Sequence, residues 1–345
     1  FTSIREWSNR SKTTKIEEGK WTKRDVARAA ASIYDPHGLI SPFTARAKVI
    51  LQEIWKRPEL DWDSTLPPEI SMPWEQYLEQ VFIIPEIKIN RWLKFEPKCT
   101  YQLHTFCDAS EEGLCCAVYL RVKKRKEVDA NLIAAKARIS PLKAESISRL
   151  ELAACVMGVR LCHAIQDIYR VKVDECFYWT DSMVSLHWIN TPAKAFKAFV
   201  AHRIGEIQTH TEPRQWFHVS GKENPADVGT RKISALELKE SELWWKGSPF
   251  LLLSPTEWPK RTIYPEIVED KEIKHTSFKL QANARPKLLI IPEERKTRGL
   301  NLIHPEHTSV GLQWDGLKQI TRRLAYVIRF LRGARRGRRL SLIHI

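Results

Sequence analysis

The amino-acid sequence predicts an α/β fold with a mixed five-stranded sheet and flanking helices. Three short runs with strand character follow one another after Cys99, separated by turn residues. A long stretch of helical periodicity comes next, and two further strand-like runs alternate with helical stretches up to Arg231. Three antiparallel neighbours followed by strand–helix units are typical of a mixed sheet.

The five strands are expected at residues 101–108, 114–122, 128–135, 176–180 and 215–219. Gly113 and the charged run 123–127 mark the turns that make the first three strands a meander. The long helix is expected over 148–169, because apolar residues recur there every three or four positions. Shorter helices are expected over 182–189 and 196–208.

A small helical module is expected before the sheet. Helical periodicity over 24–34 stops at the turn Asp35-Pro-His-Gly38, Ser41-Pro42 opens a second helix, and Leu66-Pro-Pro-Glu introduces a third. The predicted organisation is a flexible segment over 1–21, the helical module over 22–95, the sheet domain over 96–245, an irregular proline-rich linker over 246–312, a basic amphipathic helix over 313–339 and an artefactual tail over 340–345.

Composition narrows the class of protein. A formal net charge of +15 favours a polyanionic partner, although charge alone is a weak signal. No run of about eighteen apolar residues occurs, so no membrane partner is expected. The seven cysteines contain no Cys-x-x-Cys pair and are expected to be buried thiols, with adjacent Cys115 and Cys116 on opposite faces of a strand. The first residue is not Met and no apolar signal core follows, so the chain is expected to begin within a longer polypeptide.

Four carboxylates stand in contexts that predict a shared site. Asp108 and Asp181 each end a predicted strand, Glu151 lies near the start of the long helix, and Asp227 lies in a turn-rich stretch. Strand ends lie at the sheet edge where open α/β sheets place their active sites. Four carboxylates meeting there would repel one another unless divalent cations neutralised them. The pattern therefore predicts a two-metal site that acts on phosphodiesters.

Each acid also has a purely structural interpretation. Asp181 could cap the helix that follows it, Asp227 could form a turn, and Glu151 could be a solvated acid in a first helical turn. Asp108 has the fewest such explanations, because an acid at the end of a buried strand is costly without a partner. These alternatives remain open from the residues alone.

The flanking residues carry a family resemblance. Phe106-Cys-Asp-Ala-Ser110, Arg149-Leu-Glu-Leu-Ala-Ala154, Trp179-Thr-Asp-Ser182 and the stretch 219–227 resemble the RNase H domain of BEL/Pao-type LTR retrotransposon Pol polyproteins. Residues 22–26 and 33–49 resemble the segment after the reverse-transcriptase palm, and 321–331 resembles the helix before the integrase. The resemblance covers roughly residues 22–335.

This resemblance implies an RNase H-like fold and a Mg²⁺-dependent endoribonuclease that cleaves the RNA strand of RNA/DNA hybrids during reverse transcription. Asp108 would bridge two Mg²⁺ ions, Glu151 would bind one, Asp181 the other, and Asp227 would be the loosest ligand. Mn²⁺ is a possible substitute. The products would carry 5′-phosphate and 3′-hydroxyl ends. The other open interpretation is a catalytically inactive nucleic-acid-binding remnant of a decayed element.

Nucleic-acid contacts are expected from five further residues. Ser182 and Asn224 would contact the backbone or 2′-hydroxyls of the hybrid. Lys194, Lys197 and Arg203 would contact phosphates of the DNA strand, with a solvated helix face as the competing interpretation. The resemblance also implies partners, the missing reverse-transcriptase palm and integrase regions of the same polyprotein, and an intracellular, cytoplasmic location in a virus-like particle.

Overall fold

The structure, a computed structural model, describes residues 20–89, 96, 99–125, 127–168, 173–231, 233–259 and 272–273. Most of the segment predicted to be flexible lies outside these residues. The same holds for most of the predicted linker, the whole basic helix predicted over 313–339 and the tail predicted over 340–345. The helical module and the sheet domain are almost completely described.

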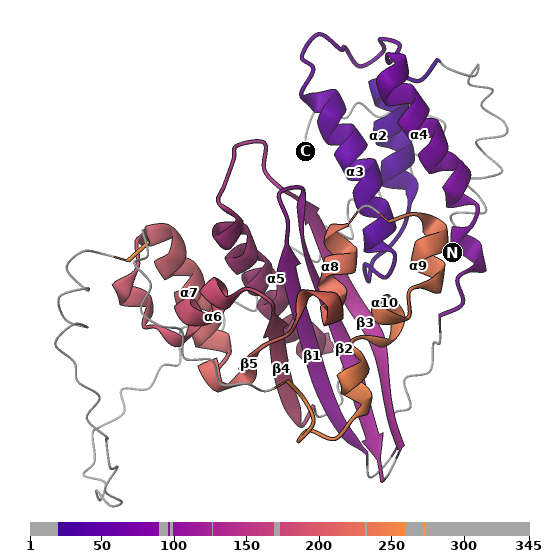
Figure 1. Ribbon diagram of the computed structural model, residues 1–345. Helices are drawn as coiled ribbons and strands as arrows, with labels where there is room; N and C mark the ends of the chain where they lie inside the picture. Colours follow the sequence, from indigo (N-terminus) through magenta and orange to yellow (C-terminus); the bar gives the residue numbers. More distant parts are fainter. Residues whose placement is uncertain are drawn as a thin grey trace, which may run out of the picture. The chain divides into compact units, whose positions relative to one another are not determined.

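The described residues form a five-stranded sheet in the order β3-β2-β1-β4-β5 (Figure 1). β1 (Thr100–Ala109) pairs antiparallel with β2 (Gly113–Lys124), and β2 pairs antiparallel with β3 (Glu127–Ile139). β4 (Glu175–Thr180) joins β1 in parallel, and β5 (Trp216–His218) joins β4 in parallel. The predicted mixed sheet is therefore confirmed.

Helices cover both faces of this sheet and create two apolar cores (Figure 1). α5 (Ile147–Ile168), α6 (Met183–Asn190) and α7 (Ala198–His210) pack on one face. On the other face lie α8 (Pro225–Thr230) and α10 (Glu242–Lys246), and α9 (Ala235–Glu240) belongs to the same apolar core. Cys115 faces the second core and Cys116 the first, as the alternation of a strand predicts. Short 3₁₀ helices connect the elements: η1 (Ile84–Glu86), η2 (Ala193–Ala195), η3 (Pro213–Gln215) and η4 (Gly221–Glu223).

The predicted helical module forms three helices, α2 (Lys23–Ser32), α3 (Ser41–Trp55) and α4 (Pro68–Val81). They hold together around aromatic residues, with the rings of Phe43 and Tyr77 stacked at 4.5 Å. These residues belong to the same buried cluster as α8, α9 and α10. The module and the sheet therefore share one core and stabilise each other.

The module also covers the edge strand β3. The backbone N–H of Ala135 donates to the carbonyl of His37 at 2.8 Å, and Gln52 Nε2 donates to the carbonyl of Ser140 at 2.8 Å. The turn that makes this approach needs Gly38, which has a φ of +69° and leaves no room for a Cβ against the Ala135 carbonyl. Covering an edge strand prevents it from pairing with other chains.

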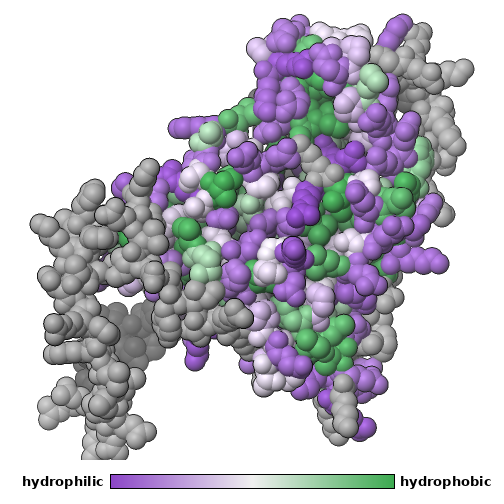
Figure 2. All heavy atoms as spheres, in the orientation of Figure 1, coloured by the Kyte–Doolittle hydropathy of each residue, from purple (hydrophilic) through white to green (hydrophobic). Residues whose placement is uncertain are grey.

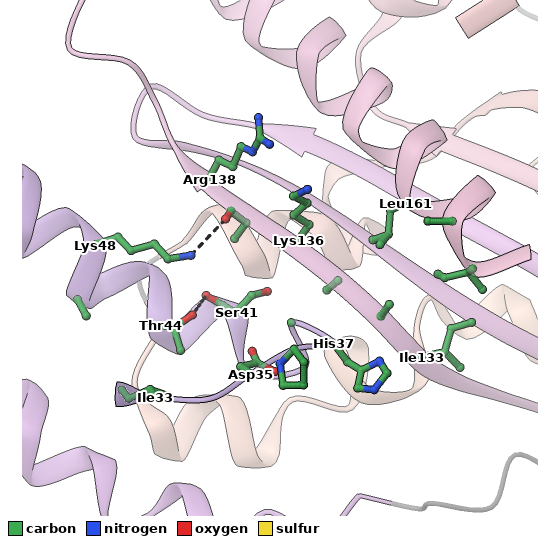
Figure 3. Close-up of a pocket in the computed structure, with 18 of the residues that line it drawn as sticks. Ile33, Asp35, His37, Ser41, Thr44, Lys48, Ile133, Lys136, Arg138 and Leu161 are labelled. Carbon is green, nitrogen blue, oxygen red and sulfur yellow. Dashed lines mark hydrogen bonds between the residues drawn. The ribbon is translucent and has the colours of Figure 1, made fainter. Parts of the chain in front are cut away.

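A cavity of about 640 Å³ lies where the module, β3 and α5 meet (Figure 3). Lys48 Nζ donates across it to the Ala137 carbonyl at 3.5 Å, and Lys136 and Arg138 lie on the same strand (Figure 3). The four candidate acids are not among its lining residues. This cavity is therefore separate from the predicted site.

The second face of the sheet is completed by residues beyond the predicted domain boundary at 245. η5 (Pro249–Leu252) buries Phe250 and Leu251, and Trp258 is buried in the same cluster. Arg121 of β2 fixes this segment, because its guanidinium donates to the carbonyls of Leu251 at 2.5 Å and Leu253 at 2.9 Å. The first residues of the predicted linker therefore belong to the packed domain, since their apolar side chains cover a sheet face.

The described helices include none long and apolar enough to cross a membrane. Hydrophilic side chains dominate the face shown in Figure 2, and apolar groups form separate patches between them. The module contributes large exposed apolar side chains, among them Trp55 and Trp62.

Candidate active site

The parallel pairing of β1 and β4 brings two of the four acids to one sheet edge. Cys107 and Thr180 are register partners, so Asp108 and Asp181 follow directly at the same end of neighbouring strands. Asp108 is buried, and Asp181 is half-buried. The sequence places both residues correctly, because strand ends determine their position.

Glu151 reaches this edge from α5. Its Oε2 accepts a hydrogen bond of 2.6 Å from Ser182 Oγ, which joins the helix to the end of β4. α5 begins at Ile147 and has no acid in its first turn, so the interpretation of Glu151 as a solvated first-turn acid is wrong. The capping interpretation of Asp181 is also wrong, because Ser182 caps α6 by accepting a hydrogen bond of 3.1 Å from Ser185 N.

α8 supplies the fourth acid, Asp227, from its first turn. The start of this helix is fixed by Asn224, whose Nδ2 donates to the Cys107 carbonyl at 3.1 Å and whose Oδ1 caps the helix. One turn further on, Thr230 Oγ1 donates to Asp108 Oδ2 at 2.7 Å. The stretch predicted as turn-rich is thus a short helix anchored to the end of β1.

The electrostatics join these carboxylates into one group. Burial is the main cause that raises the pKa of Asp108, to about 6, and the Asp181 and Asp227 carboxylates add to it while the Thr230 hydrogen bond opposes it. Burial likewise raises the pKa of Glu151, with Asp108 adding to the effect. The pKa of Asp181 is raised by burial and by the carboxylates of Glu151 and Asp227. The pKa of each of these three acids is therefore raised by at least one other carboxylate of the group.

Asp227 differs because it has a cationic partner. Arg231 Nη2 lies 2.6 Å from Asp227 Oδ2 and Arg231 Nε donates to Asp227 Oδ1 at 3.1 Å, so the guanidinium engages both oxygens. In the part of the chain that the structure describes, no three His, Cys, Asp or Glu side chains stand close enough together to form an assembled metal site. The four acids thus share one sheet edge without forming a compact set of ligands.

The residues nevertheless fit a hard divalent cation. Asp181 Oδ1 is buried and has no hydrogen-bond donor within the described residues. Such an oxygen is costly unless it is satisfied. A set of carboxylate oxygens is also the donor type that Mg²⁺ and Mn²⁺ take. Asp181 Oδ1 therefore lacks a hydrogen-bond partner, and it could instead coordinate a cation.

The sequence comparison with protein families agrees with this arrangement. Residues 22–182 match the family described as Pao retrotransposon-like RNaseH-like domain. This segment belongs to that family. It contains Asp108, Glu151 and Asp181, and ends before Asp227. The matched range also includes the whole helical module, which fits the shared core of module and sheet.

Solved structures show a weaker similarity. The N-terminal RNase H domain of a Mycobacterium tuberculosis protein is 9% identical, covers 38% of this chain and 94% of its own, and has a TM-score of 0.27. LC11-RNase H1 in complex with an RNA/DNA hybrid is 11% identical, with 37% and 91% covered and a TM-score of 0.27. RNase H1 from Halobacterium salinarum is 12% identical, with 37% and 90% covered and a TM-score of 0.24. No curated protein matches the sequence.

The residues predicted to contact nucleic acid have different positions in the Pao-type domain. Ser182 and Asn224 are buried and hold Glu151 and α8 in place, and their predicted contacts with a hybrid stay a prediction. Lys194 and Lys197 are exposed near the start of α7. Arg203 is half-buried, with its guanidinium 3.5 Å from the centre of the Phe199 ring. The predicted phosphate contacts of these three cations stay a prediction.

Sequence reasoning missed three residues beside the acids. Thr230 and Arg231 follow Asp227 at the three- and four-residue spacing that places side chains on one helix face. The interpretation of this stretch as a turn concealed that spacing. Gly221 lies close to Asp181, since a Cβ at position 221 would be 3.2 Å from Asp181 Oδ2.

Proposed function

We propose that this chain is a metal-dependent endoribonuclease that cleaves the RNA strand of RNA/DNA hybrids, as part of a retrotransposon Pol polyprotein. One observation carries the proposal: β1, α5, β4 and α8 bring four carboxylates to one sheet edge in a Pao retrotransposon-like RNaseH-like domain. Burial and mutual repulsion raise the pKa of Asp108, Glu151 and Asp181. Perturbed acids concentrated in this way favour a functional site over a structural one.

Asp108, Glu151, Asp181 and Asp227 would hold two Mg²⁺ ions, for which Mn²⁺ could substitute. When bound, these ions would supply Lewis-acid stabilisation of the phosphodiester and lower the pKa of a bound water. The buried, donor-free oxygen of Asp181 supports a cation at this place. The products would be 5′-phosphate and 3′-hydroxyl ends.

The residues around the acids would orient them. Thr230 and Ser182 each donate a hydroxyl hydrogen bond to one carboxylate oxygen, of Asp108 and Glu151 respectively. Such a hydrogen bond restricts rotation of the carboxylate and gives its second oxygen a defined direction. Asn224 acts one step further out, because it fixes the start of α8 on which Asp227 stands. Partners of this kind orient metal ligands in many sites.

The DNA strand of the hybrid would lie along the start of α7. Lys194, Lys197 and Arg203 would meet its phosphates there, and the net charge of +15 supports a polyanionic partner. Phosphate contacts of this type bind the substrate and fix its register without reading its sequence.

The test uses the complete 345-residue chain, because the module and residues 249–258 share a core with the sheet. A hybrid with a labelled RNA strand is incubated with Mg²⁺, with Mn²⁺ and with a chelator. The wild type should cleave the RNA strand only with a metal, and Asp108→Asn should lose this activity. Glu111→Gln is the matched control, since Glu111 is an exposed acid three residues away.

Two outcomes would contradict the proposal. Equal cleavage by the wild type and Asp108→Asn would show that cleavage does not depend on the proposed carboxylate site. Salt-sensitive hybrid binding without cleavage in either metal would favour the inactive nucleic-acid-binding remnant. The ion pair of Arg231 with Asp227 favours this second function, because the guanidinium engages both carboxylate oxygens that would otherwise bind a metal.

A further inference from the structure

Glu272 and Ile273 contact α5 and the start of α7, although both helices lie far earlier in the chain. The Lys197 backbone N–H donates to the Glu272 carbonyl at 2.8 Å, and Phe196 forms an isolated antiparallel bridge with Ile273. Ile273 is 6% exposed and belongs to the core formed with α5 and α7. Backbone pairing and burial of an apolar side chain together make this a specific contact.

The Glu272 side chain meets Arg149 of α5. Arg149 Nη2 lies 2.8 Å and Arg149 Nε 3.0 Å from Glu272 Oε1, and Nη1 of the same guanidinium donates to Glu145 at 3.2 Å. The Glu272 side chain is only 15% exposed. A carboxylate from a distant segment therefore occupies the Nε–Nη2 edge of Arg149, the edge with which arginine also grips phosphates.

The surroundings of Arg149 concentrate positive charge. Its guanidinium lies 4.7 Å from the centre of the Phe199 ring, and Arg203 lies 3.5 Å from the same centre. Burial is the main cause that lowers the pKa of Arg203; Glu145 and Glu206 oppose it, and the charges of Arg160 and Arg149 add to it. Lys197 is exposed at the start of α7, and its backbone N–H donates to the carbonyl of Glu272. The cluster can accept an anion from outside α5 and α7.

We propose that Arg149, together with Arg203 and Lys197, forms an anion site for a DNA-strand phosphate of the hybrid, and that Glu272 fills this site in the free chain. The inference rests on the proposed function. Glu272 is then an internal competitor: a phosphate must displace its carboxylate to reach Arg149. Docking of the 272–273 segment and binding of nucleic acid therefore oppose each other.

The competition is measured as hybrid binding by the complete chain in a chelator, where no cleavage occurs. Fluorescence anisotropy with a labelled RNA/DNA hybrid gives Kd at several KCl concentrations. Glu272→Gln should tighten binding roughly threefold, the scale of a partly exposed ion pair. The slope of log Kd against log salt should steepen by about one, because one more phosphate contact forms.

Three variants separate occupancy of the site from general charge. Ile273→Ala keeps every charge but loosens the segment, and should also tighten binding. Glu206→Gln removes an acid of α7 that pairs with Arg160 of α5, and should tighten binding less than Glu272→Gln. In an Arg149→Met background, Glu272→Gln should give no tightening.

Equal tightening by Glu206→Gln and Glu272→Gln would overturn the site, since only net charge would then matter. Unchanged Kd for Glu272→Gln would overturn it too, and a lowered Tm in that variant would leave a structural tether as the role of Glu272. Absence of hybrid binding by every variant would also reject it. A chain that binds but never cleaves would sink the proposed function and leave the anion site intact.

Discussion

Two buried charges at opposite ends of the same strand pair show how this domain treats structure and function differently. Arg121 pairs in register with Gln102 at one end of β1 and β2, and Asp108 pairs with Cys115 at the other. Arg121 donates to the Gln102 side chain and to two carbonyls, and lies 5.1 Å from the Trp258 ring. Asp108 receives one hydroxyl hydrogen bond and lies near other carboxylates.

The two charges differ in the groups that surround them. A buried charge is tolerated when donors and acceptors complete its hydrogen bonds. Arg121 has them, and ties residues 251–253 to the sheet. Asp108 receives one side-chain hydrogen bond, from Thr230, and burial and the nearby carboxylates of Asp181 and Asp227 raise its pKa. The partners of these two buried charges thus distinguish a structural contact from a candidate active site.

The largest effect is expected from Asp181→Asn, which removes the acid with the donor-free oxygen. Cleavage of the hybrid should fall by about a thousandfold, since loss of even an outer partner of a metal ligand costs about 10- to 100-fold. The rate is measured at saturating Mg²⁺, with Asp167→Asn on the exposed end of α5 as the control. A loss below tenfold would place Asp181 outside the site.

Arg121→Met tests the other end of the comparison. It leaves the carbonyls of Leu251 and Leu253 and the Gln102 side chain without their donor, so the free energy of unfolding should fall by about 3 kcal/mol. Urea denaturation measures this, and exposed Lys123→Met on the same strand is the control. Cleavage per folded molecule should stay unchanged. Equal destabilisation by both variants would mean that the Arg121 hydrogen bonds contribute nothing specific.

The pH dependence of stability without metal tests the raised pKa of Asp108. Its pKa of about 6 in the folded chain lies above the ordinary value of 3.8, so the folded state binds this proton more tightly than the unfolded state. The free energy of unfolding should therefore fall as pH rises from about 4 to about 6, by roughly 3 kcal/mol from this group, and level off above. Asp108→Asn should flatten that part of the profile and stabilise the metal-free chain at pH 7. A profile identical to that of the wild type would contradict the shift.

The smallest effect is expected from Arg231→Gln, which frees Asp227 from its cationic partner. Because Arg231 is exposed, its ion pair is weak, and the Mg²⁺ concentration for half-maximal cleavage should fall only two- to threefold. Arg214→Gln is the matched control, since exposed Arg214 pairs with Glu212 away from the acids. A raised Mg²⁺ requirement would show that Arg231 supports the site.

The periodicity of the chain predicts most of the fold correctly. β1, β4 and α5 lie within one or two residues of their predicted bounds, because alternation and helical spacing report which face of an element is buried. α8, α9 and α10 are too short for a period to emerge, since each has five or six residues. Periodicity therefore identifies the longer elements but not these three short helices.

The sequence alone determined which acids end strands, and hence that Asp108 and Asp181 share an edge, because strand ends and parallel pairing follow from local pattern. Tertiary structure decided what each partner does. Ser182 and Asn224 became buried positioning residues, Thr230 reached Asp108 across 122 positions of sequence, and residues beyond 245 closed the second core. Such contacts depend on how elements pack in space, and no local pattern records which distant side chain will meet a given atom.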